Sequence, residues 1–365
     1  MPRRRRRWLG PLAVNGTLAV ICFIWLVPTI GLLVSSVRPA ADVLNSGWWS
    51  VLPHQDYVTT KELPIPTGVT GDAPITIEGV TATFDAFREG VTASDGKRIQ
   101  WIGNRRAGRI EVQEKQWVAS PNFTLRNYQV VLSGGDKTYE NTGGTLRTER
   151  GSDLGSAFMN SIAVTIPATV IPLTVAAFAA YGFAWMRFRG RMALFALLVA
   201  LLVIPLQIAL VPVLRDYVGL DLNGTYLGVW LAHTGFGLPL AIYLVFGFVS
   251  EIPRDLIDSA VTDGASHFAV FRRIIVPLSV PVLASFAIFQ FLWVWNDYLV
   301  ATTFLGGTQD VQVLTIKLVN LAGTRGQDWQ LLTAGAFVSM IIPLIVFFAL
   351  QRYFVRGLLA GSVKG

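Results

Sequence analysis

Long stretches without a charged residue dominate the pattern of this chain. Asp, Glu, Lys and Arg are absent from residues 8–37, 154–186, 192–214, 222–250, 274–296 and 329–351. Each stretch exceeds the ~20 helical residues that cross the hydrocarbon core of a bilayer. One such stretch could be a buried helix of a soluble protein, but six indicate a polytopic membrane protein. We therefore expect an all-α membrane fold with six transmembrane helices, the third bent by Pro205 and Pro212.

The segment between the first two hydrophobic stretches follows a different pattern. Residues 39–150 are polar and rich in Gly, Pro and Thr. Apolar and polar residues alternate with a period of two in short runs between turn signals, which is typical of strands. The runs lie at 75–77, 80–84 and 109–113, and the turn signals at 70–72 and 94–96. The pattern predicts a small β-rich domain inserted between helices 1 and 2.

Composition agrees with a membrane location and restricts the chemistry. Of the 365 residues, 52% are hydrophobic and 15% are charged, and the mean hydropathy is +0.51, whereas about a quarter of residues are charged in soluble domains. The single cysteine, Cys22, excludes an intramolecular disulfide framework and a thiolate metal cluster. The three histidines, His54, His233 and His267, are too dispersed to predict a metal site.

The positions of the basic residues predict the orientation in the membrane. The net charge of +7 could suggest nucleic-acid binding, but the basic residues cluster beside the hydrophobic stretches, so we expect lipid and no nucleic acid as a partner. Short basic clusters mark the cytoplasmic side. They are Arg3–Arg7; Arg187, Arg189 and Arg191; Arg254, Arg272 and Arg273; and Arg352, Arg356 and Lys364. Both termini are therefore predicted to be cytoplasmic.

This orientation divides the chain into four parts. Residues 1–38 comprise a basic cytoplasmic N-terminus and helix 1, which we expect to be retained because its apolar run is about twice that of a signal peptide. Residues 39–150 form the extracytoplasmic domain. Residues 151–351 carry helices 2 to 6 with a cytoplasmic loop at 251–277, and residues 352–365 form a cytoplasmic tail.

The loop 251–277 predicts a short helix-turn-helix at the membrane surface. Pro253 suits the first turn of a helix, Gly264 a left-handed cap, and Ser266 the start of a second helix. Small residues at the tip would let a partner protein approach closely, although an amphipathic helix on the membrane surface has the same pattern. The apolar face of the first helix would comprise Leu256, Ile257, Ala260 and Val261.

The same loop resembles the Glu-Ala-Ala loop of permease subunits in binding-protein-dependent ABC importers. Asp258 and Ser259 stand where that family has Glu and its first Ala. The residues that carry the resemblance are Asp258, Ser259, Ala260, Asp263, Gly264, Ala265, Ile274, Pro277 and Pro281. Further segments, namely 123–128, Trp295-Asn296-Asp297 and the tail 357–365, resemble the maltose-type sugar permeases. Residues 47–49 and 230–239 look most like the α-glucoside permease subunit.

The resemblance implies a heteromeric importer in a bacterial inner membrane. Such importers combine two different permeases, two ATPase subunits and an extracytoplasmic sugar-binding protein. The ATPase subunits bind ATP and Mg, and this chain lacks a G-x-x-x-x-G-K-[ST] loop. We therefore expect it to hold no cofactor, not to be an enzyme, and to form half of a pathway for α-glucosides such as maltose, trehalose or sucrose.

The resemblance also implies two contacts with the ATPase subunits. The loop would dock into a cleft of one ATPase and transmit its closure to the spans, and the tail would reach between the two ATPases. The coupling residues would be Asp258, Ser259, Ala260, Asp263, Gly264, Ala265, Ile274 and Pro277. The tail residues would be Leu358, Leu359, Ala360, Gly361, Ser362, Val363, Lys364 and Gly365.

Aromatic and polar residues of the fifth stretch form a candidate sugar path. They recur at helical spacing, and such a mixture suits a sugar because rings cover its C–H face while polar groups bind its hydroxyls. A membrane carboxylate is itself a functional candidate. The alternatives are that Asp297 pairs with Arg215, Lys317 or a partner subunit, and that the Phe and Trp of the stripe only pack inside the protein. The candidates are Phe286, Gln290, Trp293, Asn296 and Asp297, with His233 on the fourth stretch, for which a hydrogen-bonded packing role is the alternative.

The loop 305–329 is long for a mere connection between spans. Its central segment, 311–319, could be a short strand or a helix, and glycine pairs on both sides predict hinges. In the resembling permeases this loop reaches into the binding protein; a simple connector is the alternative. The candidate contacts are Gly306, Gly307, Gly323, Arg325 and Gly326.

Two other functions are compatible with the same sequence. The cargo could be another oligosaccharide or a polyol phosphate, because the motifs do not separate these substrates. A membrane sensor with an external ligand-binding domain is the alternative from a different class.

Overall fold

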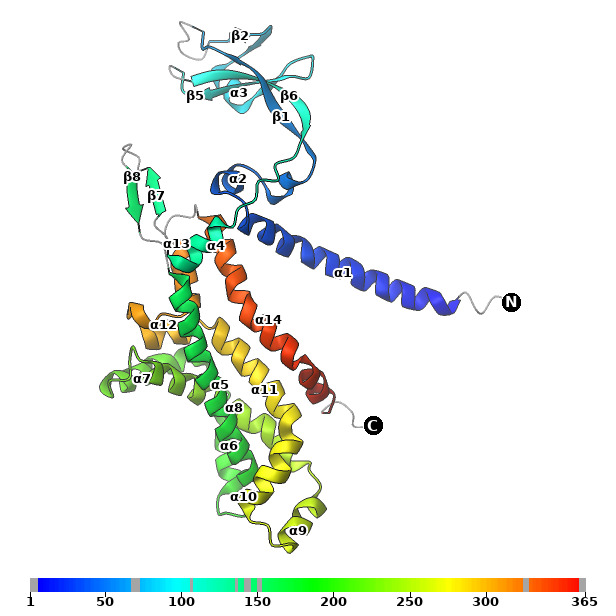
Figure 1. The fold of residues 1–365 in the computed structure, drawn as a ribbon, viewed down its shortest axis with the longest axis vertical. Coiled ribbons are helices and arrows are strands. Elements are labelled where there is room, and N and C mark those ends of the chain that lie inside the picture. Colours follow the sequence, from blue (N-terminus) through cyan, green and yellow to red (C-terminus); the bar gives the residue numbers. More distant parts are fainter. Residues whose placement is uncertain are drawn as a thin grey trace. The chain divides into compact units, whose positions relative to one another are not determined.

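The computed structural model describes residues 6–66, 73–105, 108–134, 137–140, 146–149, 153–323 and 328–360. The chain divides into two compact units (Figure 1). The first, here called the sheet unit, comprises Met1–Val34 and Arg38–Thr124, and the second, here called the bundle, comprises Ser35–Val37 and Leu125–Gly365. The division falls at Thr124, so residues 125–150 group with the helices rather than with the β-rich segment as the sequence suggested.

Among the described residues, five helical runs are long and apolar enough to cross a membrane. They are α1 (Arg6–Ser36), α5 (Leu154–Trp185), α8 (Tyr226–Ser250), the run of α10 (His267–Val270), the π-helix η2 (Phe271–Ile275) and α11 (Val276–Asn296), and α14 (Trp329–Ala360). These runs coincide with five of the six charge-free stretches.

The remaining stretch forms two helices rather than one. Helices α6 (Arg191–Leu201) and α7 (Leu206–Gly219) meet at 105°. Pro205 has extended backbone, with ψ at 129°, and has no N–H with which to continue α6. Pro212 lies inside α7. The bend expected at Pro205 is therefore a complete break, and six spans result only if this pair counts as one.

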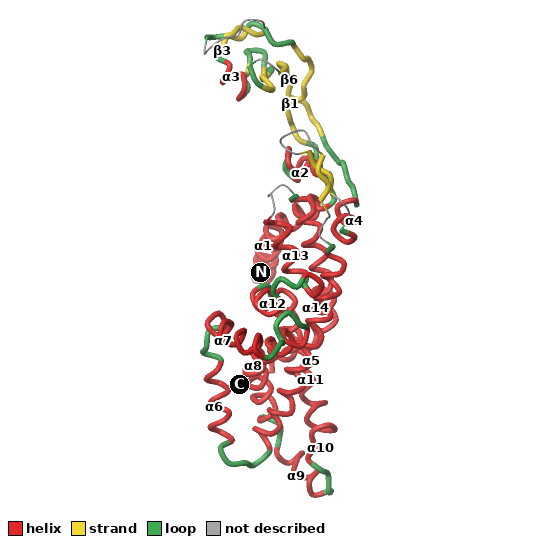
Figure 2. Tube along the Cα trace, turned by 90° about the vertical axis from the view of Figure 1, so that its left-hand side faces the viewer, coloured by secondary structure: helices red, strands yellow, loops and turns green. Residues whose placement is uncertain are grey.

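Helix α5 lies along α8 and α11 at the centre of the bundle (Figure 2). Ala168, Ala176 and Ala180 of α5 are fully buried, and small residues let helices approach closely. One apolar cluster surrounds α12 (Leu299–Leu305), which includes Phe304, and another lies beneath α9 (Arg254–Thr262). Figures 1 and 2 show α9 and α10 at one end of the bundle and α13 (Leu314–Gly323) towards the other.

Two smaller elements complete the bundle. Helix α4 (Arg126–Ser133) packs against α14 and α5. The strands β7 (Lys137–Glu140) and β8 (Leu146–Glu149) form an antiparallel hairpin. Asp153 caps α5 by accepting a hydrogen bond from the Ser156 N–H at 3.1 Å, which satisfies one of the free donors at the start of the helix.

The sheet unit contains a four-stranded antiparallel sheet. Its order is β1 (His54–Leu63), β6 (Gly108–Val118), β5 (Arg98–Gly103) and β4 (Val91–Thr92). β2 (Ile75–Ile77) and β3 (Val80–Ala82) form a separate hairpin, which α3 (Phe84–Glu89) follows. The core of the unit comprises Ile77, Phe84, Phe87, Ile99, Trp101 and Ile110.

The strand predictions for this unit hold with one correction. Residues 75–77 form β2 and 109–113 lie in β6, while the turn at 94–96 joins β4 to β5. Phe84 does not end a strand. Thr83 caps a helix there by accepting a hydrogen bond from Ala86 N, and the Phe84 ring stacks edge-on against Trp101 at 5.1 Å. The predicted turn at 70–72 lies outside the described residues.

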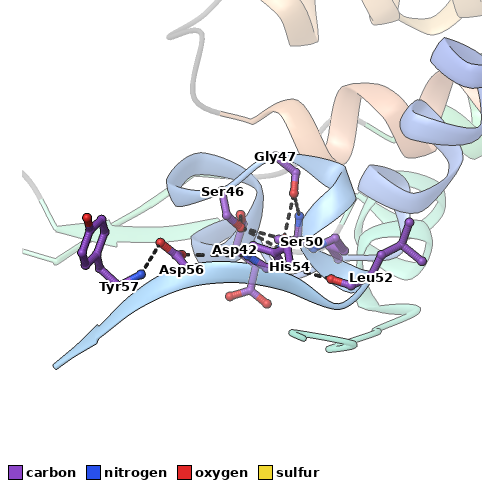
Figure 3. Close-up of polar contacts among 9 residues, drawn as sticks. Asp42, Ser46, Gly47, Ser50, Leu52, His54, Asp56 and Tyr57 are labelled. Carbon is purple, nitrogen blue, oxygen red and sulfur yellow. Dashed lines mark hydrogen bonds and ion pairs between the residues drawn. The ribbon is translucent and has the colours of Figure 1, made fainter. Parts of the chain in front are cut away.

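A hydrogen-bonded turn leads into β1. Arg38 is fully buried and donates to the carbonyl of Gly47 and to Ser46 Oγ, both at 2.9 Å. Ser50 Oγ donates to the same Gly47 carbonyl at 2.8 Å (Figure 3). A side chain at Gly47 would meet the Trp49 ring at 2.3 Å. The Gly47-Trp48-Trp49 motif therefore has a structural reason here, which is to close this turn.

Candidate functional site

The loop 251–277 contains a short helix closed by a well-formed cap. Helix α9 ends at Thr262, and Gly264 has a φ of +83°. The Ala265 N–H donates to the carbonyl of Ala260 at 2.9 Å, and the Gly264 N–H donates to the carbonyl of Val261 at 3.0 Å. These two bonds define a Schellman motif, which provides donors for carbonyls that the end of the helix would otherwise leave without a hydrogen bond. The left-handed cap predicted at Gly264 is present.

A second cap follows at once. Ser266 precedes α10, and its Oγ accepts a hydrogen bond from Ala269 N at 3.3 Å, as the sequence predicted. His267 Nδ1 lies 2.9 Å from the Tyr181 hydroxyl of α5. The helix-turn-helix is therefore joined to the bundle by a polar contact as well as by its apolar residues.

The apolar face of α9 is only partly covered. Ile257 is buried and Ala260 is half-buried, but Leu256 and Val261 are 46% and 50% exposed. The predicted apolar face is therefore buried on its Ile257 and Ala260 side and exposed at Leu256 and Val261. The reason is geometric, because only one side of so short a helix faces α8 and α11.

Several coupling candidates lie on the exposed side of this helix-turn-helix. Asp258, Ser259, Asp263 and Gly264 are exposed and Ala265 is half-exposed. Phe268 is 62% exposed, and the sequence reasoning missed it. Its signal was an aromatic residue directly after the small residues of the tip. Together these residues present an apolar and acidic surface to a partner.

Ile274 and Pro277 lie behind that surface. Ile274 is half-buried in the cluster beneath α9, and Pro277 is the second residue of α11. The π-helix η2 directly precedes α11. Proline has no N–H to donate to the preceding turn, and such a gap in the backbone ladder is a common site of a π-bulge.

The candidate sugar stripe lies inside the subunit. Phe286 and Gln290 are 2% and 1% exposed, whereas Trp293 is half-buried and Asn296 is exposed. Gln290 Nε2 donates to the carbonyl of Ala168 at 3.1 Å and to that of His233 at 3.4 Å. The stripe faces α5 and α8, so Phe286 and Gln290 hold helices together, which differs from the expectation of a face open to sugar.

His233 and Asp297, which the sequence treated separately, are brought together by the fold. His233 Nε2 lies 3.4 Å from Asp297 Oδ2, and the two side chains are 0% and 7% exposed. His233 Nδ1 lies 3.0 Å from the carbonyl of Val229. Asp297 therefore pairs with His233 and not with Arg215 or Lys317, the residues considered from the sequence.

Asp297 also starts the next helix. Its two carboxylate oxygens accept hydrogen bonds from Val300 N at 3.3 Å and Ala301 N at 2.9 Å. Its backbone carbonyl accepts a bond from Thr315 Oγ1 at 2.7 Å. A carboxylate at a helix N-terminus satisfies free backbone donors. Asp297 thus joins α11, α12 and α13.

The segment after α12 is fastened to α5 rather than free. Asn160 Nδ2 donates to the carbonyls of Asp310 and Gln312 at 2.8 and 3.0 Å. Ser161 Oγ accepts from Leu314 N at 2.8 Å. The sequence reasoning missed both residues, although polar side chains in a membrane stretch are a signal of such contacts. Gly306, with a φ of +58°, ends α12, and Gly307 is exposed.

The open question of strand or helix at 311–319 is settled as helix. The 3-10 helix η3 (Gln309–Val311) leads into α13, whose Leu314, Ile316 and Leu321 are buried. Gly323 is the last residue of α13. Arg325 and Gly326 lie outside the described residues.

The C-terminal tail begins as helix. α14 continues through Leu358, Leu359 and Ala360, so the first residues of the predicted tail are helical. Gly361, Ser362, Val363, Lys364 and Gly365 lie outside the described residues.

Among the described residues, no group of three or more His, Cys, Asp or Glu could hold a metal ion. The exposed helix-turn-helix lies at one end of the bundle, and the segment that Asn160 and Ser161 hold against α5 lies towards the other. Helices α8 and α11 connect them.

Comparison with known protein families identifies the bundle. Residues 157–359 match the model of the binding-protein-dependent transport system inner membrane component. This match includes α8, the Schellman-capped α9, and Asp297, whose carboxylate lies beside His233. The chain belongs to this family. It is the membrane-spanning permease component of an ABC transporter, in which partner subunits carry out ATP hydrolysis.

Similar permeases cover nearly the whole chain. The osmoprotective compounds uptake permease protein GgtD of Synechocystis sp. is 46% identical over 99% of this chain and 95% of its own length. The alpha-glucoside transport system permease protein AglG of Rhizobium meliloti is 45% identical over 97% of each chain. The trehalose transport system permease protein SugB of Mycobacterium tuberculosis is 34% identical over 68% of this permease and 91% of its own length.

A solved structure shares the fold of the permease. A chain from a bacterial ABC transporter involved in the import of the acidic polysaccharide alginate matches with a TM-score of 0.60 at 16% identity. The match covers 97% of this permease and 99% of that chain. Membership in this family places the permease among multi-pass inner-membrane transport proteins and not among membrane sensors.

Proposed function

We propose that this permease forms one half of the translocation pathway of an ATP-driven importer for α-glucosides, with maltose, trehalose and sucrose as representative cargos. The observation that supports this proposal most is the similarity to AglG, which at 45% identity spans 97% of the chain and so includes the sheet unit. SugB, named for trehalose, matches 68% of the chain. The name of GgtD favours an osmoprotective compound as the second candidate cargo.

The complex would contain a second permease, two ATPase subunits and an extracytoplasmic sugar-binding protein. The end of the bundle with α9 would face the cytoplasm, and both termini would lie there. Arg254, Arg272 and Arg273 are exposed at this end, and clusters of basic residues favour the cytoplasmic side. The opposite end carries charges of both signs, among them Asp310 and Lys317.

Helix α9 and the tip after it would dock into an ATPase subunit. The Schellman cap holds the tip in one geometry, and exposed Leu256, Val261 and Phe268 provide apolar surface for a partner. The negative charges of Asp258 and Asp263 would orient the tip relative to the ATPase. The tail from Leu358 to Gly365 would reach between the two ATPases, as in the permeases that this chain resembles.

The opposite end would meet the loaded binding protein. Gly306 and Gly307 follow α12 in an exposed loop that Asn160 fastens to α5, so a push on this loop would be transmitted to the bundle. Gly323, Arg325 and Gly326 would complete this contact. Sugar contacts from this subunit would come from Trp293 and Asn296, the members of the stripe with exposed surface.

The test is reconstitution of the complex in lipid nanodiscs with its binding protein. We expect ATPase activity to rise when the binding protein carries trehalose, sucrose or maltose, and not when glycine betaine, a non-sugar osmoprotectant, is added instead. Stimulation by glycine betaine alone would contradict the α-glucoside assignment. Co-purification without any ATPase subunit would contradict the importer.

The proposed orientation has a separate test. In a Cys22→Ser background, a cysteine at Gly307 should react with a membrane-impermeant maleimide added to spheroplasts, whereas a cysteine at Ser259 should react only after the membrane is opened. The opposite pattern would reverse the proposed orientation.

A further inference from the structure

The His233–Asp297 pair is a buried contact between an imidazole and a carboxylate within the apolar part of the bundle. The two side chains are 0% and 7% exposed, with 3.4 Å between Nε2 and Oδ2. The edge of the Trp293 ring covers the imidazole, with ring centroids 5.4 Å apart. Removing one partner of such a pair leaves a buried polar group without its partner, and ionisable residues inside membrane-spanning segments mark functional positions.

No other ionisable partner competes for either group in the helices that enclose the pair. The described residues of α5, α8, α11 and α12 include no further Asp, Glu, Lys, Arg or His. Arg215 and Asp216 of α7 are exposed, and Lys317 of α13 acts on Asp153. The contact is therefore a specific link between two elements and not part of a charge network.

The pair joins α12 to the first turns of α8. Asp297 holds the start of α12 through the Val300 and Ala301 amides, at 3.3 and 2.9 Å. The other end of α12 is tied to the residues before α8, because the Gly224 N–H donates to the carbonyl of Phe304 at 2.7 Å. One end of α12 is thus fixed to α8 and the other to the residue two positions before it.

Helix α8 leads without interruption to the other end of the bundle. It runs from Tyr226 to Ser250, and Val249 at its last turn packs in one buried cluster with Ile252 and with Ile257 of α9. Pro239 lies inside this helix and removes one of its backbone hydrogen bonds, so the connection from start to end relies on the packing of α8 against its neighbours as well as on the helix itself. The structure therefore contains a continuous mechanical connection between the loop at Gly306 and the exposed tip at Gly264.

We propose that the buried His233–Asp297 contact is the positioning contact that couples α12 to α8, so that engagement of the loop at Gly306–Gly307 is transmitted through α8 to α9. The proposal rests on the proposed function, since it needs a binding protein at one end and an ATPase at the other. It gives the pair a role in communication between the two ends in place of the sugar contact expected from the sequence.

Three variants test the pair. His233→Gln leaves both capping bonds of Asp297 in place and keeps a donor for the carbonyl of Val229. Asp297→Asn replaces the carboxylate by an amide, whose single oxygen can accept from only one of the Val300 and Ala301 amides. The double variant places two neutral amides against each other, which can hydrogen-bond without a buried charge. Thr315→Val is the matched control, because it removes the 2.7 Å bond to the Asp297 carbonyl and leaves the pair intact.

The measurements are co-purification of the ATPase subunits, basal ATPase activity, and ATPase activity with trehalose-loaded binding protein. We expect each single variant to assemble and to keep its basal activity, while stimulation falls by about 3- to 30-fold. The double variant should recover part of this loss, and Thr315→Val should behave as wild type. Full stimulation in both single variants would overturn the proposal, as would an equal loss in Thr315→Val or a double variant that shows no recovery.

Hydrogen–deuterium exchange on the wild-type complex tests the same connection without a variant. Addition of loaded binding protein should change the exchange of residues 299–305 and of α9 together. A change confined to 299–305 would overturn the coupling role. A wild-type complex that no loaded binding protein stimulates would contradict the proposed function and the coupling with it, whereas stimulation of wild type and of both single variants would contradict the coupling alone.

Discussion

Single glycines impose the strictest requirements on the bundle. Gly264 has a φ of +83° with open space around it, whereas Gly228 is helical and lies against backbone. A side chain at Gly264 would strain the backbone without meeting other atoms. A side chain at Gly228 would clash directly with the backbone. The two positions therefore predict different consequences of substitution.

Replacing Gly264 should impair coupling without preventing membrane insertion. Gly264→Val places a β-branched residue in the left-handed region at a cost of about 1–2 kcal/mol, and this cost would distort the Schellman cap. Gly264→Asn is the control, since Asn tolerates this conformation. We expect uptake of labelled trehalose to fall in the Val variant and to be largely kept in the Asn variant, at equal amounts of protein in the membrane. Equal uptake by both variants would argue against a docking role for the tip.

Replacing Gly228 should destabilise the start of α8. A Cβ there would lie 2.2 Å from the carbonyl oxygen of Leu222, and relieving such overpacking costs about 1–3 kcal/mol. Gly235 of the same helix has nothing within 4 Å of its Cβ position, so Gly235→Ala is the matched control. Fluorescence-detected size-exclusion chromatography after heating should show a lower melting temperature for Gly228→Ala only. An equal fall in both variants would mean that the clash at Gly228 does not decide, and helix propensity would not explain it, since Ala favours a helix more than Gly does.

At the scale of elements, polar residues place helices and strands where apolar packing does not specify a geometry. Asn160 and Ser161 fasten the segment before α13, and Gln290 bridges α5 and α8. In the sheet unit Glu111 of β6 has the same role. Its carboxylate accepts hydrogen bonds from Arg109 at 2.7 Å, Thr59 at 2.8 Å and Gln113 at 3.1 Å.

These contacts make the stability of the sheet unit depend on pH. Burial by itself raises the pKa of Glu111, but the bonds from Arg109, Thr59 and Gln113 outweigh it, and the net pKa lies below its ordinary value. The stabilisation, about 1 kcal/mol, is therefore present above the unfolded pKa of about 4.3. It is lost as the pH falls through the lower folded pKa.

Glu111→Gln should remove this dependence. At pH 7 the variant should be less stable than wild type, and the difference should shrink as the pH approaches 3. The measurement is hydrogen–deuterium exchange of β5 and β6 in the full-length protein, with exchange times scaled for the intrinsic pH effect. A difference that stays constant between pH 7 and pH 3 would show that the carboxylate charge contributes nothing.

At the scale of the whole molecule, the permease connects two exposed regions through a mostly apolar bundle. The helix-turn-helix at Gly264 and the loop at Gly306 are the surfaces on which partners would act, and α8 and α11 join them. The sheet unit, which includes most of α1, is a separate compact unit. Partners can therefore act on the bundle through a few short segments.

The tail belongs to this scale, because its expected contact is with two other subunits. Deleting Leu358–Gly365 should lower the ATPase activity of the complex or the uptake per ATP, because the segment between the ATPases would be lost. Deleting Gly361–Gly365 alone keeps α14 to its end at Ala360 and serves as the control for general destabilisation. If the longer deletion kept uptake and ATPase activity at the wild-type level, the tail would have no functional contact with the ATPases.

Much of this architecture could be predicted from the sequence because the relevant interactions are local. Charge-free stretches of sufficient length specify spans, alternation in twos specifies β2 and β6, and Gly264 and Ser266 specify caps within a few residues of themselves. The family resemblance also followed from a short segment, because the spacing around Asp263 is contiguous in the chain.

Only the tertiary structure decided which polar residues meet and which faces are covered. His233 and Asp297 lie on different helices, so their contact depends on how α8 and α11 pack. The same holds for the burial of Gln290, the exposure of Leu256 and Val261, and the fastening by Asn160. Helical spacing shows that residues share a face, but the neighbouring helices determine whether that face meets protein, lipid or solvent. That choice depends on contacts between distant parts of the chain, which a local pattern does not contain.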